Sequence, residues 1–459
     1  MKAQRRILGI FSLTQVATLA VLLVPALMGY GERASAGEAL LVYYDGHMHT
    51  TRSDGSGSVA DIKATALSRG LSAVVITDHC KSLTQSEWAS LVAECEANSD
   101  ATFLALPGVE VTGSDGMFNR DHINAIGIED PFVGDDFSEL CPEELWESPP
   151  NPAGTGAMYP ENLRKWVDYI HSKGGIAVHN HPSGTTVLQY GVKNLEVYNQ
   201  SHVDDVASYA SLLGYSPEEA WQFGMMLNNL AIYGENSENV HMIVDNPFPP
   251  GFFPFPLPPQ MPVRNVLYLA TLAFSGVGQW LGSPEAPLNS WDDLLMAYVD
   301  GTVDTPTFGV ANSDAHNTGA PDSDVGLAKN GLYLKKKLTA RQLFKAIKAG
   351  RNFATTGPSL ALDINGELMG DTAYILDGVA DINLSASSES PTAILVKIDI
   401  IKNGSVWQTF NPMSPTYEIA LGDNAVTGDG YYRVEVTSYD LVDGSYYFAW
   451  SNPVFARVP

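Results

Sequence analysis

The sequence predicts an α/β fold that is followed by a small antiparallel β-sandwich. From Tyr43 to about Gly357, short apolar runs alternate with helical stretches, which is the pattern of a parallel sheet or a barrel. These runs are almost continuously apolar, as strands are when both faces of their sheet are covered. Beyond Pro358 the runs instead alternate apolar and polar residues, which is typical of half-buried antiparallel strands.

Residues 1–36 are predicted to be an export signal. Basic residues precede an apolar run from Ile7 to about Met28, and Ala34-Ser35-Ala36 offers a small-residue cleavage site. The apolar run is also long enough to remain as an uncleaved anchor, which is the alternative. We therefore expect an exported protein, periplasmic or extracellular, with no stable membrane span after cleavage of the signal.

The composition excludes several classes of protein. The 459 residues include 26 Lys and Arg against 52 Asp and Glu, which gives a formal net charge of −26. A surface this acidic repels phosphate backbones, so we expect no nucleic-acid partner. The three cysteines, Cys80, Cys95 and Cys141, are too few for a disulfide scaffold, and Cys80 is expected to be a buried thiol. The sequence leaves the oligomeric state open.

The first domain is predicted to span residues 40–357. Its clearest element is the apolar strand Leu71–Thr77, which follows a helix that begins with a capping box at Ser58 and stops near Gly70. Further strands are predicted over Phe103–Val111, His122–Ile128, Gly175–His179, Asn194–Asn199 and Thr307–Asn312. Helices are predicted over Glu161–Lys173, Ser290–Val299 and Thr339–Ala349.

A segment of about residues 201–285 interrupts this alternation, because it is too long for a loop between two strands. It contains two helical stretches, Pro217–Ile232 and Val263–Leu281, on either side of the proline- and phenylalanine-rich residues 246–262. We interpret it as an ordered surface insertion. A lid over the active site and a membrane-contacting loop are the alternatives.

Residues 359–459 are predicted to form the β-sandwich. Strands are predicted over Ala393–Ile401, Ser405–Phe410, Tyr417–Leu421, Tyr431–Tyr439 and Tyr446–Trp450. Asn403-Gly404 lies between the first two of these strands and is a strong indicator of a hairpin turn.

Histidine and carboxylate residues recur in short motifs at the ends of the predicted strands. The motifs are DGHMHTTRSDG with His47, His49 and Asp54, ITDH with Asp78 and His79, PGVEVT with Glu110, DHINAIG with His122, AVHNHP with His179 and His181, and NSDAH with Asp314 and His316. In α/β barrels the loops at the strand ends converge on one mouth. Imidazole and carboxylate ligands together suit Zn, Mn or Fe, and this many ligands predicts two or three divalent ions.

These motifs, in this order, resemble the polymerase-and-histidinol-phosphatase (PHP) superfamily of metal-dependent hydrolases, over about Tyr43 to Gly357. The NSDAH motif and the later stretch KAIKAGRNFATTGPSLALDINGELMGDT look closest to the carbaryl-hydrolase branch. The resemblance implies a distorted (β/α)7 barrel, here with a long insertion, that carries two or three metal ions at its strand ends.

The resemblance also implies a set of metal ligands. It assigns His47, His49, Glu110 and Asp314 to one ion, Asp54, His79 and His316 to a second, and His122 and His181, with Glu110 bridging, to a third. The motif AVHNHP offers a further histidine, His179, so the choice between His179 and His181 stays open, with His181 favoured.

The expected activity is hydrolysis of an ester, phosphoester or amide bond of a small molecule by metal-activated water. Asp78 and Arg52 are the candidate catalytic side chains, and Arg52 could hold an anionic substrate. One alternative is an exported metal-binding or carbohydrate-associated protein whose metal site is structural. Against it, structural metal sites are closed and use few ligands. Another alternative is an amidase of the same superfamily.

Overall fold

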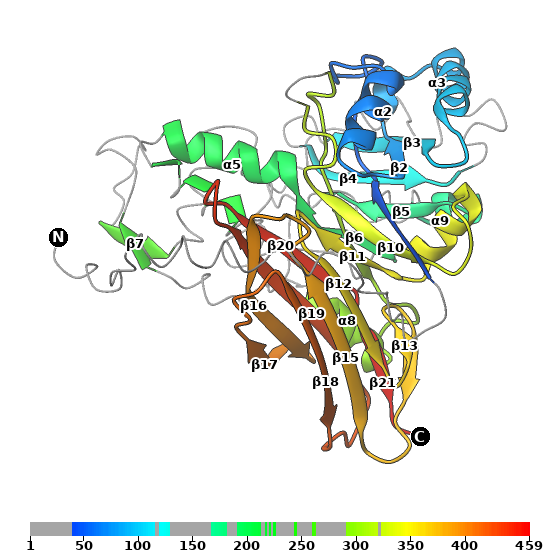
Figure 1. Cartoon of the computed structure of the whole chain (residues 1–459). Coiled ribbons are helices and arrows are strands. Elements are labelled where there is room, and N and C mark those ends of the chain that lie inside the picture. Colours follow the sequence, from blue (N-terminus) through cyan, green and yellow to red (C-terminus); the bar gives the residue numbers. More distant parts are fainter. Residues whose placement is uncertain are drawn as a thin grey trace. The chain divides into compact units, whose positions relative to one another are not determined.

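The computed structural model describes residues 39–114, 119–128, 167–180, 191–212, 216–217, 220–221, 224–225, 243–245, 259–262, 291–319 and 323–459. These residues form a mixed α/β structure that contains more strand than helix (Figure 1). The predicted export signal, residues 1–36, lies outside them, as do His181, Cys141 and most of the predicted insertion. Within the described part of the chain, no helix is long and apolar enough to cross a membrane.

Eight strands neighbour one another in the order β10–β1–β2–β3–β4–β5–β6–β9. Their bounds are β1 Leu40–Asp45, β2 Ala73–Ile76, β3 Leu104–Ser114, β4 Asn119–Ile126, β5 Ile176–His179, β6 Asn194–Asn199, β9 Phe308–Asn312 and β10 Lys329–Leu334. The six strands predicted for this domain are all present, whereas β1 and β10 were not predicted.

The pairing of these strands is mixed. The pairs β1–β2, β2–β3, β5–β6 and β6–β9 are parallel, whereas β10–β1, β3–β4 and β4–β5 are antiparallel. The regular repeat of parallel strands and helices expected of seven β/α units is therefore not confirmed. One reason is local: β4 follows β3 after too few residues for a crossover helix, and a short connection pairs strands antiparallel.

Side-chain amides join β9 to β10 and to the next strand, β11 (Asn352–Thr355). Asn330 on β10 accepts a hydrogen bond from the backbone N–H of Ala311 at 2.9 Å and donates to the carbonyl of Ala311 at 2.6 Å. Asn352 donates to the carbonyl of Gly309 at 3.0 Å. Because β10 also pairs with β1, these bonds connect β10 and β9, the first and last of the eight strands in this order.

The helices with defined bounds are α2 Val59–Ser68, α3 Gln85–Asn98, α5 Gln200–Leu212, α8 Trp291–Val299 and α9 Ala340–Lys348. The predicted capping box of α2 is confirmed: the side chain of Ser58 accepts from the backbone of Asp61, and the Asp61 side chain accepts in return. Gly70 follows with a φ of 75°, which ends the helix. Helix α3 and the short 3-10 turn η1 (Cys80–Ser82) were not predicted.

Two apolar clusters hold the helices on the strands. Ile62 of α2 and Leu91 of α3 share one buried cluster with Val74 and Ile76 of β2, which places these helices on the outer face of the strands (Figure 1). A second cluster contains Val75, Ile126, Val178 and Val310 from the strands, and Leu343 and Ile347 from α9. Helix α9 therefore packs against the opposite face of β2 from α2 and α3.

Beyond Gly357 the chain is almost entirely strand. Strands β12 Ser359–Ile364, β13 Glu367–Leu368, β15 Ala380–Ser387 and β18 Thr416–Asp423 form a four-stranded sheet in the order β13–β12–β15–β18. Strands β14 Thr372–Tyr374, β16 Ala393–Lys402, β17 Ser405–Phe410, β19 Gly430–Asp440, β20 Tyr446–Ser451 and β21 Val454–Arg457 belong to the fifteen-stranded sheet that also holds β1 to β6. Side chains from both sheets share one buried core.

The strands on the two sides of the predicted boundary at residue 357 belong to one sheet, because β11 pairs antiparallel with β20. Asn452, just after β20, accepts from the backbone N–H of Gly309 at 2.7 Å and donates to its carbonyl at 3.0 Å. Ala39–Pro459 accordingly forms one compact unit. The predicted hairpin at Asn403-Gly404 is confirmed, with φ of 50° and 77° between β16 and β17.

Two short strands, β7 (Ile243–Asp245) and β8 (Gln260–Pro262), pair antiparallel within the predicted insertion. The expectation for Cys80 is corrected: its side chain is buried but takes part in a disulfide bond. Cys95 on α3 is a buried free thiol.

Candidate metal centre

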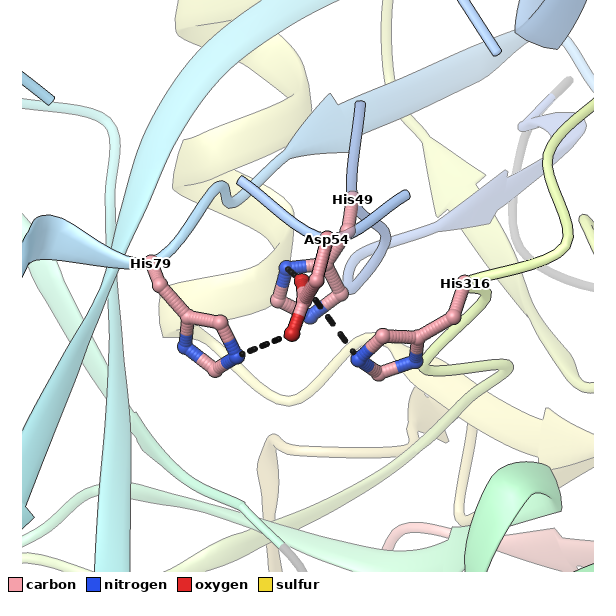
Figure 2. Close-up of side chains that lie close together, drawn as sticks. All are labelled: His49, Asp54, His79 and His316. Atoms are coloured by element: carbon pink, nitrogen blue, oxygen red, sulfur yellow. Dashed lines mark ion pairs between the residues drawn. The ribbon is translucent and has the colours of Figure 1, made fainter. Parts of the chain in front are cut away.

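Histidine and carboxylate side chains from the strand ends converge on one place in the structure. Three overlapping groups have ligand atoms within 4.8 Å of one another: His49, Asp54, His79 and His316; His47, His49 and Glu110; and His79, Glu110 and His122. Figure 2 shows the first group, with Asp54 between His79 and His316. Because His49, His79 and Glu110 each belong to two groups, neighbouring ions would share ligands.

Asp314 joins the same cluster. Its Oδ1 lies 3.1 Å from Nε2 of His47 and 3.2 Å from Nε2 of His49. The structure thus brings together eight of the nine predicted metal ligands: His47, His49, Asp54, His79, Glu110, His122, Asp314 and His316. The ninth, His181, lies outside the described residues.

The segment after β1 runs alongside the segment after β9, and this places the first and last motifs together. Met48 forms an isolated parallel bridge with Ala315, and the backbone N–H of His49 donates to the Ala315 carbonyl at 2.9 Å. Met48 is buried in the core between its two histidine neighbours. The alternation along an extended chain therefore directs His47 and His49 to the side opposite Met48.

A tight turn brings Asp54 back onto the histidine that precedes it. The backbone N–H of Gly55 donates to the Thr50 carbonyl at 3.0 Å. A Cβ atom at Gly55 would lie 2.0 Å from the backbone oxygen of His49, so only glycine fits this approach. The turn sets Oδ1 of Asp54 3.5 Å from Nδ1 of His49, and Oδ2 3.2 Å from Nε2 of His79.

Asp78, a predicted catalytic residue, is buried and holds this turn. Its carboxylate accepts from the backbone N–H and the hydroxyl of Thr50, both at 2.7 Å, and from the hydroxyl of Ser53 at 2.6 Å. These three donors all belong to the segment that carries Asp54. Asp78 therefore positions that segment.

The structure does not bring Arg52, the other predicted catalytic residue, into the cluster. Its guanidinium lies 2.6 Å from Oε2 of Glu94 and 3.3 Å from Oγ of Ser90, both on α3. This ion pair connects the segment after β1 to helix α3.

Glu110 lies at the centre of the cluster and is buried. Its Oε1 lies 2.8 Å from Nδ1 of His122, and its Oε2 lies 2.9 Å from Nδ1 of His79. Burial opposes the ionised form, but His122, His47 and His79 outweigh it and hold the pKa of Glu110 well below its usual range. The carboxylate is therefore charged.

The same reasoning applies to His79. Burial disfavours its charged form, but Glu110 and Asp54 outweigh this effect and raise the pKa of His79 to about 10. The carboxylates of Glu110 and Asp54 thus favour positive charge at His79, as a proton or as a metal ion in its place. Asp314 adds a conformational feature, because its φ of 53° lies in the left-handed region, which is uncommon for a residue other than glycine. Such conformations gather at functional sites.

The strand register separates His179 from Glu110. His179 pairs with Ile123, whereas Glu110 pairs with Asn124, so His179 and Glu110 lie on opposite faces of the sheet. Among the described residues, none of the ligand groups therefore includes His179, the alternative to His181. Its neighbour Asn180 instead donates from Nδ2 to Oε1 of Glu110 at 2.8 Å.

Three polar residues that contact the ligands were not predicted: Asn180, Glu196 and Asn199. Asn312, which contacts Glu196, was not predicted either. Glu196 and Asn199 belong to the strand Asn194–Asn199, which the sequence did predict. A glutamate within an otherwise apolar, buried strand could have pointed to them, since a buried carboxylate requires polar partners.

The donor set fits divalent metal ions such as Zn, Mn or Fe. The cluster is also open on one side. The side chains of Asp54 and His316 are 51% and 39% exposed, whereas those of His47 and Glu110 are buried. An open side gives a substrate and water access to bound ions, which a closed structural site does not.

No protein-family model matches this sequence, and no curated protein matches it either. One similar solved structure is a two-domain protein containing a predicted PHP-like metal-dependent phosphoesterase from Bacteroides vulgatus. It is 12% identical, with a TM-score of 0.36 over 92% of this chain and 99% of that chain. Another is an amidohydrolase from Chromobacterium violaceum with bound sulfate and no metal, at 20% identity and a TM-score of 0.24 over 36% of this chain and 81% of that chain. TM-scores of this size do not establish a common fold.

Proposed function

We propose that this protein is a metal-dependent hydrolase of the PHP type, which cleaves an ester or phosphoester bond in a small molecule. The observation that carries the proposal is the geometry of the cluster. Three ligand groups overlap, and one side of the cluster is open to solvent. Overlapping groups favour two or three ions that share ligands, and the open side favours catalysis over a structural site.

Different candidate ligands would bind different ions. His47, His49, Glu110 and Asp314 would hold the buried ion, while Asp54, His79 and His316 would hold the ion on the open side. His122 and, by resemblance, His181 would hold a third ion that Glu110 bridges. When bound, divalent ions of this kind supply Lewis acidity and lower the pKa of water. Asp78 would keep the turn that carries Asp54 in place.

The wider proposal includes the fold and the cellular location. It comprises a distorted (β/α)7 barrel over residues 40–357, a β-sandwich over 359–459, and export through residues 1–36. The acidic composition, with a formal net charge of −26, favours a small-molecule substrate over a nucleic acid. The zinc, manganese or iron content, and the choice between ester and phosphoester, are left to experiment.

Metal analysis followed by activity assays tests the proposal. We expect the purified protein to contain or take up divalent ions, and to hydrolyse one class among chromogenic phosphoesters and carboxyl esters with added Mn, Zn or Fe. Chelation and the variant Glu110→Ala should each abolish turnover. The control is Asp371→Asn, which alters a carboxylate that pairs with Arg351 in the fold and should remain active. A protein that takes up no metal under any of these conditions would rule the proposal out.

A further inference from the structure

We infer that Glu196 is a positioning residue that sets the metal affinity of the cluster by orienting His47. Glu196 lies on β6, and 1% of its surface is exposed. Its Oε1 lies 2.9 Å from Nδ1 of His47. The inference rests on the proposed function, because it assigns Glu196 a role toward the ions that the cluster would hold.

The orientation of Asn312 determines which atoms donate to Glu196. Oδ1 of Asn312 accepts from the backbone N–H of Gly46 at 2.9 Å, and a backbone N–H can only donate. The other end of the amide, Nδ2, therefore donates to Oε1 of Glu196 at 2.8 Å. On the second carboxylate oxygen, Nδ2 of Asn199 donates to Oε2 at 2.8 Å. Glu196 is thus held as a hydrogen-bond acceptor by residues of β6 and β9.

An acceptor at this position selects the tautomer of His47. Nδ1 of His47 donates its hydrogen to Glu196, so Nε2 is the atom available to a metal. Nε2 in turn lies 3.4 Å from Oε1 of Glu110 and 3.1 Å from Oδ1 of Asp314. These two carboxylate oxygens favour positive charge at Nε2, which either a hydrogen on Nε2 or a metal ion bound to it supplies. The carboxylate of Glu196 therefore orients the imidazole ring and increases its basicity toward a bound metal ion.

Asn199 extends the arrangement to a second ligand. Its Nδ2 lies 3.4 Å from Oδ2 of Asp314 while it donates to Glu196. The side-chain amide of Asn199 therefore lies between Glu196, which contacts His47, and the candidate ligand Asp314. Glu196 and Asn199 lie three residues apart on β6, and a register shift between Glu196 and Tyr198 lets both side chains reach the same site.

Titration of the chelated protein with Mn²⁺ in a calorimeter tests the inference. We expect Glu196→Gln to weaken Mn²⁺ binding by roughly 10- to 100-fold. The melting temperature of the metal-free protein should fall, because the amide nitrogen of glutamine would face an N–H donor at one of the two oxygens of Glu196. The control below separates this loss of stability from the loss of affinity. Glu196→Asp, which keeps the charge, should recover part of the affinity. Asn199→Ala removes one donor to Glu196, leaves the carboxylate in place, and should weaken binding less than Glu196→Gln does.

Asp423→Asn is the matched control, because Asp423 is also a buried carboxylate but accepts from Tyr432 in the C-terminal sheet. It should lower thermal stability and leave Mn²⁺ affinity unchanged. If Glu196→Gln binds Mn²⁺ as the unaltered protein does, the inference is wrong while the proposed function stands. If Glu196→Gln does not fold, unchanged affinity in Asn199→Ala overturns it equally. If the unaltered protein binds no divalent ion, both fail together.

Discussion

Nε2 of His49 lies 3.2 Å from Oδ1 of Asp314, although 265 residues separate the two in the chain. The parallel bridge between Met48 and Ala315 brings them together, because it runs the segment after β1 beside the segment after β9. The assembly of the metal centre therefore depends on this contact between the two segments.

Replacing Asp314 by asparagine should separate its chemical role from its conformational role. Asparagine tolerates the left-handed φ of 53° and keeps the size of the side chain, but it removes the charge between His47 and His49. We expect Asp314→Asn to remain folded and to lose bound metal and turnover, as measured by metal analysis and by the chromogenic assay. Asp314→Ala should also lose stability. Unchanged metal content in Asp314→Asn would contradict the assignment of Asp314 as a ligand.

The variant Arg52→Ala should have a small effect. Arg52 pairs with Glu94 on α3, and the side chains are 17% and 28% exposed, so the pair should contribute up to about 1 kcal/mol to the free energy of unfolding. Turnover of phosphoesters and of carboxyl esters should change equally little. The matched variant Glu94→Gln should behave in the same way. A selective loss of phosphoester turnover in Arg52→Ala would show instead that Arg52 reaches the substrate.

Removing Asp292 should strongly destabilise the protein. The guanidinium of Arg433 on β19 is fully buried, and it donates to both carboxylate oxygens of Asp292 on α8 at 2.8 and 2.7 Å. Asp292→Ala would leave that charge without its main partner, at a cost of roughly 3–5 kcal/mol in urea unfolding. The pair of Lys63 and Asp100, with side chains 23% and 48% exposed, is the control, and Asp100→Asn should destabilise the protein much less. Equal losses in the two variants would contradict this account of the buried pair.

Deleting residues 358–459 should prevent the remaining chain from folding stably. The deletion removes β20, the partner of β11, and Asn452, which bonds to both backbone groups of Gly309 on β9. We expect a loss of the cooperative thermal transition and of metal uptake. The point variant Asn452→Ala should cost about 1–3 kcal/mol, because it leaves buried backbone groups of Gly309 without these partners. A truncated chain that folds and binds metal would show that the two regions are independent.

Several parts of the fold could be predicted because their cause is local. The capping box at Ser58 and the hairpin at Asn403-Gly404 depend on residues within a few positions of each other. The predicted strands of the first domain correspond to β2, β3, β4, β5, β6 and β9, since apolar runs of this length form buried strands. Strands β12 and β15 were missed, and so were β1 and β10.

The composition of the metal centre could be predicted in large part, whereas its surroundings could not. Eight predicted ligands lie together: six of them follow β1, β2 or β9, whereas Glu110 and His122 lie within the paired strands β3 and β4. Arg52 illustrates the limit: the sequence places it beside the ligands, but α3 lies close enough for Glu94 to bind it. His179 illustrates the same limit, because the register of β4 with β5 decides which face of the sheet the His179 side chain occupies.

The sequence by itself determined the ligand types, their order and their position at strand ends, because metal chemistry and strand periodicity depend on residue identity and local spacing. Only the tertiary structure decided the mixed pairing of the strands, the bonds from Asn330 and Asn452 to β9, and the place of Glu196 behind His47. These features depend on contacts between residues far apart in the chain. Such contacts depend on which strands pair and in what register, and no local pattern encodes them.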